Sequence, residues 1–199
     1  MSLPLTHCIK TFVSPHPHNY LSTLSFCRRA KSGGIMVKFL LLALTFGLAQ
    51  AQIEGKRKTV AIASSRTEKI ELGGELRIYC RELSCDEGCK EMKVTFYVNE
   101  NGQCSLTTIT GYLQEDGETY RTQFHGDNHY SAVKQTQEYI VFYSENVDRD
   151  NQETKLVFVV GNQPLTPEQR ERLVQYVVSK GIPPENIRDV LETDTCPDL

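Results

Sequence analysis

The feature that most limits the fold of this chain is a short pattern that occurs eight times between residues 58 and 160. Each occurrence is a run rich in Val, Ile, Thr, Tyr and Phe, and most runs end near a turn signal such as Gly73-Gly74 or Asp116-Gly117. Short runs of this kind predict antiparallel strands in a meander, a sandwich or a barrel. A meander of eight strands can close on itself and lose its exposed edges. The expected strands are Lys58–Ala63, Glu75–Leu83, Glu91–Asn99, Cys104–Leu113, Thr119–Phe124, His129–Lys134, Glu138–Ser144 and Thr154–Val160.

Alternation within the runs predicts which side chains face the interior. In residues 76–81 the apolar side chains share one face, and Arg77 and Arg81 lie on the other. Residues 92–98 alternate in the same way. The last run, residues 156–160, is apolar on both faces, so another element should cover its outer side.

One amphipathic helix after the eighth run should supply this cover. Residues 166–169, Thr-Pro-Glu-Gln, form a capping box with proline at the first helical position. Gly181 and the two prolines that follow Ile182 prevent the helix from continuing. The apolar stripe of the helix consists of Leu173, Val174, Val177 and Val178. The sequence therefore predicts an all-β, eight-stranded antiparallel up-and-down barrel with one C-terminal α-helix packed outside.

The first fifty residues differ from the rest. Residues 1–35 are rich in Ser, Pro and His, so they are expected to be an unstructured N-terminal extension. Residues 36–51 combine Lys38, an apolar run and an Ala-Gln-Ala end, which is typical of a secretory signal peptide. The apolar run is too short to span a bilayer, so we expect no membrane insertion. Cleavage after Ala51 would leave residues 52–199 as one secreted, extracellular domain.

Charge and motif content exclude several function classes. The formal net charge is −3 and no block of Lys and Arg stands out, so nucleic acid is not an expected partner. The sequence shows no Ser/His/Asp signature, Gly-rich phosphate loop or carboxylate dyad, so we expect neither an enzyme nor a cofactor. His125 and His129 flank Asp127 in a turn, where a solvated loop is expected rather than a metal site or a proton relay.

Six stretches spread over residues 55–199 carry a resemblance to a known family. They are EKIELGGELR at 68–77, CDEGC at 85–89, TFYV at 95–98, LTPE at 165–168, IPPENI at 182–187 and TDTCP at 193–197. Together they resemble the lipocalins, and among these the mammalian odorant-binding proteins and aphrodisin. The resemblance implies a lipocalin barrel for residues 52–199.

One position departs from the family pattern. Where lipocalins carry a Trp on the first strand, this chain has Arg57, and it contains no Trp at all. An Arg stem can lie over the barrel end with its charged head in water, but it fills less volume than an indole. We therefore expect that end of the barrel to be less stable or more open.

Five cysteines remain after residue 51, which leaves one without a partner. Cys85 and Cys89 are expected to form a disulfide; the alternative, a zinc site, lacks the four ligands that zinc needs. The resemblance implies a second disulfide, Cys104–Cys196. Cys80 is then left over and should be a small buried hydrophobe. No metal site is expected.

The resemblance implies a secreted carrier of small hydrophobic odorants or pheromones. Such a carrier is compatible with a homodimer and with a cell-surface receptor as a further partner. Two other functions stay open: a protein signal or aldehyde scavenger, and an isomerase using Cys80, since the lipocalin prostaglandin D synthase has its catalytic cysteine on the same strand. Alternation along the runs predicts most of the ligand-binding residues, and the resemblance implies Asn128 and Ser144. These are Ile62, Leu76, Ile78, Cys80, Val94, Phe96, Thr122, Phe124, Asn128, Tyr130, Ser144, Leu156, Phe158 and Val160. A barrel filled by its own side chains is the alternative to such a cavity.

Overall fold

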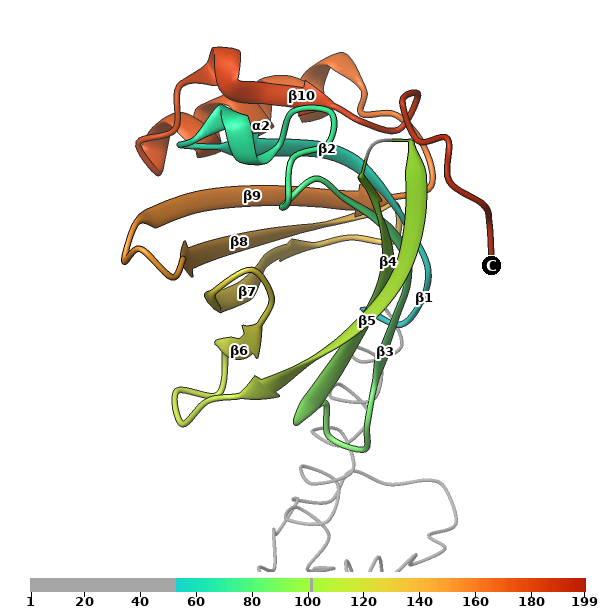
Figure 1. Cartoon of the computed structure of the whole chain (residues 1–199), viewed down its shortest axis with the longest axis vertical. Helices are drawn as coiled ribbons and strands as arrows, with labels where there is room; N and C mark the ends of the chain where they lie inside the picture. Colours follow the sequence, from blue (N-terminus) through green and yellow to red (C-terminus); the bar gives the residue numbers. More distant parts are fainter. Residues whose placement is uncertain (1–52, 101) are drawn as a thin grey trace, which may run out of the picture.

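The computed structural model of the chain describes residues 53–100 and 102–199, and its strands form one antiparallel sheet (Figure 1). The predicted extension at residues 1–35 and signal peptide at residues 36–51 lie outside the described residues. The strands are β1 (Gly55–Lys56), β2 (Lys58–Ser64), β3 (Ile78–Cys85), β4 (Glu91–Glu100), β5 (Gln103–Leu113), β6 (Tyr120–Gln123), β7 (Asp127–Gln135), β8 (Tyr139–Val147), β9 (Glu153–Gly161) and β10 (Ile187–Asp189).

The first strand segment closes the sheet into a barrel. From β3 to β9 each strand pairs with the next along the chain, as expected for a meander. β1 pairs with β3, whereas β2 pairs with β9, and only Arg57 separates β1 from β2. The Arg57 amide also donates to the carbonyl oxygen of Arg81 in β3 at 3.0 Å. The two ends of the curled sheet are therefore joined through residues 55–64, and Arg57 lies half-buried at the junction.

A single α-helix covers the outer face of the barrel, as the capping box predicts. α2 (Pro167–Ser179) begins after Thr166, whose hydroxyl accepts from the Gln169 amide, while the Gln169 side chain accepts from the Thr166 amide. Leu173 and Val177 are buried against the outward-facing apolar side chains of β2, β8 and β9. This contact explains why the last run of the sheet is apolar on both faces. Val178 was expected in the same stripe but is 53% exposed, because it lies one position beyond the contact face.

Two predictions about the strands are wrong in detail. The sheet has ten strands instead of eight, since the first strand is split at Arg57 and the three residues of β10 add to the edge of β2. The strand expected at Glu75–Leu83 begins only at Ile78. Residues 74–77 instead form turns, because the Leu76 amide donates to the carbonyl of Lys69 and the Arg77 amide to that of Gly74.

The C-terminal tail is held against β3 by two arginines and a disulfide. Arg81 donates to both carboxylate oxygens of Asp194, at 2.6 and 2.8 Å, and both side chains are 2% exposed. Arg77 is also buried and donates to the Thr193 hydroxyl at 2.8 Å. The disulfide between Cys104 and Cys196 ties the tail to β5. The tail thus covers the outward face of β3, so neither Arg81 nor Arg77, which directly precedes β3, is in solvent.

Candidate ligand-binding site

The barrel encloses a cavity of about 80 Å³ that is lined mainly by apolar side chains. Its wall is built from inward-facing positions of most of the barrel strands, together with Leu76 from the β2–β3 loop and Phe124 from the β6–β7 turn. The lining residues are Leu76, Ile78, Cys80, Leu83, Val94, Phe96, Ile109, Thr122, Phe124, Asn128, Tyr130, Phe142, Ser144, Leu156, Phe158 and Val160.

The sequence-predicted residues all lie on this wall except Ile62. Ile62 on β2 is fully buried in a cluster with Ile70, Leu76 and Val190, and it does not line the cavity. Alternation misses this because the cover comes from the β2–β3 loop and the tail.

Three lining residues escaped the sequence analysis: Leu83, Ile109 and Phe142. Phe142 lies two positions before the predicted Ser144 on β8, so extending that alternation would have found it. Ile109 is the cross-strand partner of the predicted Val94, but the prediction included no residue of its own run. Leu83 is different. The register between β3 and β4 shifts between Cys80 and Glu82, so an irregularity precedes Leu83 and strict alternation from Cys80 puts it on the wrong face.

Aromatic rings fill much of the barrel interior and shape the cavity. Phe96 and Phe124 make an edge contact with ring centroids 5.0 Å apart. Tyr130 stacks on Tyr120 at 5.5 Å and makes an edge contact with Phe142 at 6.1 Å. Edge and offset contacts of this kind are favourable arrangements for buried rings. The remaining space is therefore suited to a small molecule.

The polar side chains of the cavity wall do not contribute equally. Asn128 donates from Nδ2 to the carbonyl oxygens of Phe124 and Gly126, at 2.8 and 3.2 Å, and its Oδ1 accepts from Asn146 Nδ2 at 3.1 Å. These bonds fix the turn between β6 and β7, so the side-chain amide of Asn128 is already hydrogen-bonded within the protein. Thr122 and Ser144 add buried hydroxyl groups to the wall.

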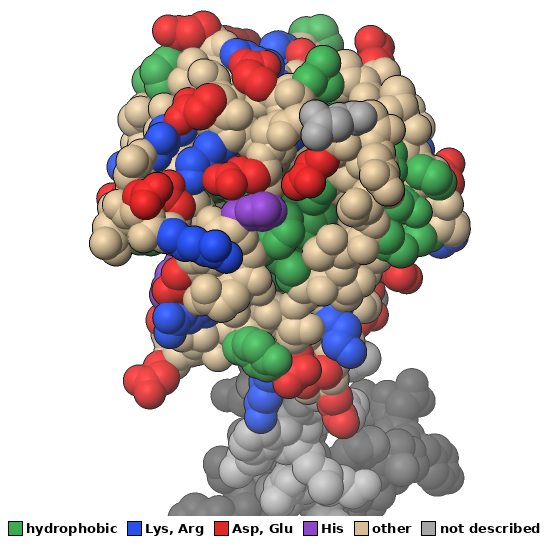
Figure 2. Space-filling view, in the orientation of Figure 1, with side chains coloured by type: hydrophobic (Ala, Val, Ile, Leu, Met, Phe, Trp, Pro, Cys, Tyr) green, Lys and Arg blue, Asp and Glu red, His purple; other side chains and the backbone are tan. Residues whose placement is uncertain are grey.

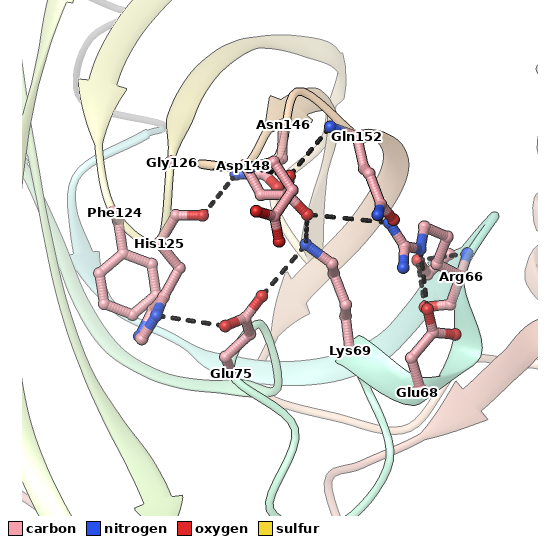
Figure 3. Close-up of polar contacts among 12 residues, drawn as sticks. Arg66, Glu68, Lys69, Glu75, Phe124, His125, Gly126, Asn146, Asp148 and Gln152 are labelled. Carbon is pink, nitrogen blue, oxygen red and sulfur yellow. Dashed lines mark hydrogen bonds and ion pairs between the residues drawn. The ribbon is translucent and has the colours of Figure 1, made fainter.

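One end of the cavity, here called the mouth, is lined by Leu76 of the β2–β3 loop and by Phe124. Figure 3 shows a set of charged contacts beside these residues. Lys69 ends the short 3-10 helix η1 (Thr67–Lys69), and its Nζ lies 2.9 Å from Asp148 Oδ2 and 3.1 Å from Glu75 Oε1. The second oxygen of Glu75 lies 3.4 Å from Nδ1 of His125, next to the cavity-lining Phe124. We call Lys69, Glu75, His125 and Asp148 the mouth network.

The mouth network joins three loops that are far apart in sequence. Burial by itself lowers the pKa of Lys69, but hydrogen bonds to Asp148 and Glu75 outweigh it and raise the pKa, so the ammonium stays charged. The hydrogen bond from Lys69 in turn lowers the pKa of Asp148, together with the Gln152 and Asp150 amides. Figure 2 shows charged side chains of both signs around a histidine on the face toward the viewer, with hydrophobic side chains beside them.

The cysteines have the pairing that the sequence analysis expected. The structure joins Cys85 to Cys89 in the β3–β4 loop and Cys104 to Cys196. Cys80 is a free thiol with no exposed surface. Burial raises its pKa to about 12, and the opposing effect of Arg81 is smaller. A thiol in this state is a weak nucleophile at neutral pH.

His125 lies in the β6–β7 turn, but the prediction that Asp127 and His129 share this turn is wrong, because both lie on β7 and pair with β6. Both histidines are exposed at the surface. Asp127 pairs with Arg121 at 2.8 Å, and this hydrogen bond is the main cause of its lowered pKa. His129 Nε2 lies 3.6 Å from the same carboxylate. Within residues 53–100 and 102–199 no cluster of three His, Cys, Asp or Glu side chains could hold a metal ion. None of the helices in this described part is both long enough and apolar enough to cross a membrane.

Comparisons with known proteins agree with this architecture. The sequence model of the "Lipocalin / cytosolic fatty-acid binding protein family" matches residues 54–194. The chain is 66% identical over 163 residues to odorant-binding protein 1a of the mouse, which covers 82% of this chain and all of that protein. Among solved structures it is similar to aphrodisin, described as a sex pheromone from the female hamster, with a TM-score of 0.72, 48% identity and coverage of 73% and 99% of the two chains. A bovine odorant-binding protein in complex with undecanal has a TM-score of 0.53, 29% identity and coverage of 73% and 93%.

Proposed function

The chain belongs to the lipocalin / cytosolic fatty-acid binding protein family, and on this premise we propose that it is a secreted carrier of small hydrophobic volatile molecules, odorants or pheromones. The observation that carries the proposal is the mainly apolar cavity inside the barrel. Its lining residues are the proposed ligand contacts. The similar proteins support the same class of ligand, since one of their solved structures is a complex with undecanal, an aldehyde of eleven carbons.

The size of the cavity favours small ligands and moderate affinity. A volume of about 80 Å³ is well below the roughly 300–1,000 Å³ of sites for drug-sized molecules. A ligand of about ten heavy atoms is larger than this space, so side chains of the wall must move to admit it. With a gain of about 0.7 kcal/mol per atom it would bind with about 7 kcal/mol, or near-micromolar affinity. Affinity in this range allows both uptake and release of a volatile molecule.

A carrier accounts for the site better than an enzyme does. The isomerase alternative needs a reactive Cys80, whereas the Cys80 thiol is buried with a strongly raised pKa. A protein signal or aldehyde scavenger would use the same fold with the cavity ligand secondary. Dimerisation or recognition by a cell-surface receptor would add to the carrier function without replacing it.

The test uses the full chain expressed in mammalian cells and recovered from the medium. Mass spectrometry should place the new N-terminus at residue 52. Fluorescent aminoanthracene should bind the secreted protein and be displaced by small volatile ketones or aldehydes at micromolar concentrations. Val94→Phe fills the cavity from β4 and should weaken probe binding without unfolding the protein. Absence of probe binding or displacement at tens of micromolar would rule out the carrier function.

A further inference from the structure

Two stacked tyrosines at the end of the cavity away from the mouth differ in one respect. Tyr120 and Tyr130 are cross-strand partners on β6 and β7, and both are buried. Tyr120 Oη donates to the carbonyl oxygen of Cys89 at 2.7 Å. Tyr130 Oη is buried without a hydrogen-bond partner. Among the described residues that line the cavity, only Tyr130 has a buried side-chain nitrogen or oxygen without a hydrogen-bond partner.

The position of the Tyr130 hydroxyl depends on a glycine in the opposite wall. A Cβ atom at Gly111 in β5 would overlap Tyr130 Oη, so only the lack of a side chain admits the hydroxyl there. Gly111 pairs with Met92, which is fully buried in the same hydrophobic cluster as Tyr130. Ile109, two positions earlier on the same face of β5, lines the cavity. The hydroxyl therefore packs against the β5 backbone at Gly111, at the edge of the cavity that Ile109 and Tyr130 line.

A buried hydroxyl without an acceptor is unfavourable, and native proteins retain few of them. Burial raises the pKa of Tyr130, so the group stays a protonated donor at neutral pH. The cavity-lining amide of Asn128 cannot take this role, because its Nδ2 is committed to the carbonyls of Phe124 and Gly126. Tyr120 cannot take it either, because its hydroxyl is bound to Cys89.

We propose that Tyr130 Oη donates a hydrogen bond to an oxygen of the bound ligand, so that the cavity selects small apolar molecules carrying one acceptor oxygen. Ketones, aldehydes, esters and ethers belong to this class. The inference rests on the proposed carrier function and adds a specificity-determining residue to it. A ligand with an acceptor oxygen would satisfy the hydroxyl, whereas a hydrocarbon of the same shape leaves it without a partner.

The experiment compares acetophenone with α-methylstyrene, which has a methylene group in place of the carbonyl oxygen. Both compete with aminoanthracene for the secreted full-length product. The wild type should prefer acetophenone, and Tyr130→Phe should reduce this preference about tenfold, the effect of about 1.4 kcal/mol. The matched control is Tyr120→Phe, which removes the neighbouring hydroxyl and should leave the preference unchanged. Gly111→Ala, which displaces the Tyr130 hydroxyl, should also reduce the preference.

The outcomes separate this inference from the carrier function. If neither compound displaces the probe from the wild type, the carrier function itself fails. If both compounds bind but Tyr130→Phe keeps the preference for acetophenone, or weakens both compounds equally, Tyr130 is a wall residue only and the inference is wrong. A thermal unfolding curve for each variant shows that the comparison is made on folded protein.

Discussion

Removing the buried carboxylate that faces Arg81 should destabilise the protein strongly. Asp194 accepts two hydrogen bonds from the Arg81 guanidinium, and both side chains are 2% exposed. In Asp194→Asn the amide oxygen can still accept one of these bonds, but the guanidinium charge is left buried without its counter-charge. Breaking a buried ion pair from one side costs about 3–5 kcal/mol, and the retained hydrogen bond places this substitution at about 3 kcal/mol. The Cys104–Cys196 disulfide keeps the tail attached in folded and unfolded protein, so the loss reports mainly on the ion pair.

The assay is urea unfolding of the oxidised protein at neutral pH, supported by a thermal scan. A loss of about 3 kcal/mol should lower the melting temperature by roughly 6–12 °C for a domain of this size. The matched control is Asp198→Asn, which makes the same chemical change in a surface pair with Lys58, where the side chains are 74% and 41% exposed. This control should show no measurable change. A loss below about 1 kcal/mol for Asp194→Asn, the range of exposed pairs, would refute the reasoning from burial.

Three further predictions concern the mouth and the free thiol. Lys69→Met removes the central charge of the mouth network and should speed ligand dissociation about fivefold in stopped-flow displacement. Lys58→Met is the control and should leave the dissociation rate unchanged. An unchanged rate in Lys69→Met would mean that the mouth network does not restrain the β2–β3 loop. The folded-state pKa of Asp148 is lowered, so its contribution to stability is present above the ordinary value of 3.8 and disappears as the pH falls through the lower folded value. Wild type and Asp148→Asn should therefore differ in melting temperature at neutral pH and converge only below pH 3.8; a constant difference would contradict this. Cys80 should resist thiol reagents at about pH 8 until the protein unfolds, and Cys80→Ala should retain ligand binding; fast labelling of folded protein would reopen the isomerase alternative.

Much of the fold and most of the cavity wall follow from local sequence patterns. Alternation over residues 78–81 and 92–98 places the inward side chains correctly, because a strand presents every second residue to the same face. The capping box of α2 is equally local, since Thr166 and Gln169 are three residues apart. Alternation fails at Leu83, which follows an irregularity in the β3–β4 register. It also fails at Ile62, which other parts of the chain cover.

The meander from β3 to β9, the covering helix and most of the inward-facing residues were thus determined by the sequence itself, because their causes act over a few neighbouring residues. The tertiary structure alone decided which polar groups far apart in the sequence found partners. Lys69 meets Asp148 across 79 positions, and Arg81 meets Asp194 across 113. Tyr120 and Tyr130 have the same side chain and adjacent places in the sheet, yet only one hydroxyl is satisfied by a distant loop. Hydrogen bonds act over about 3 Å, so their partners are set by how the barrel closes and not by the pattern of any one strand.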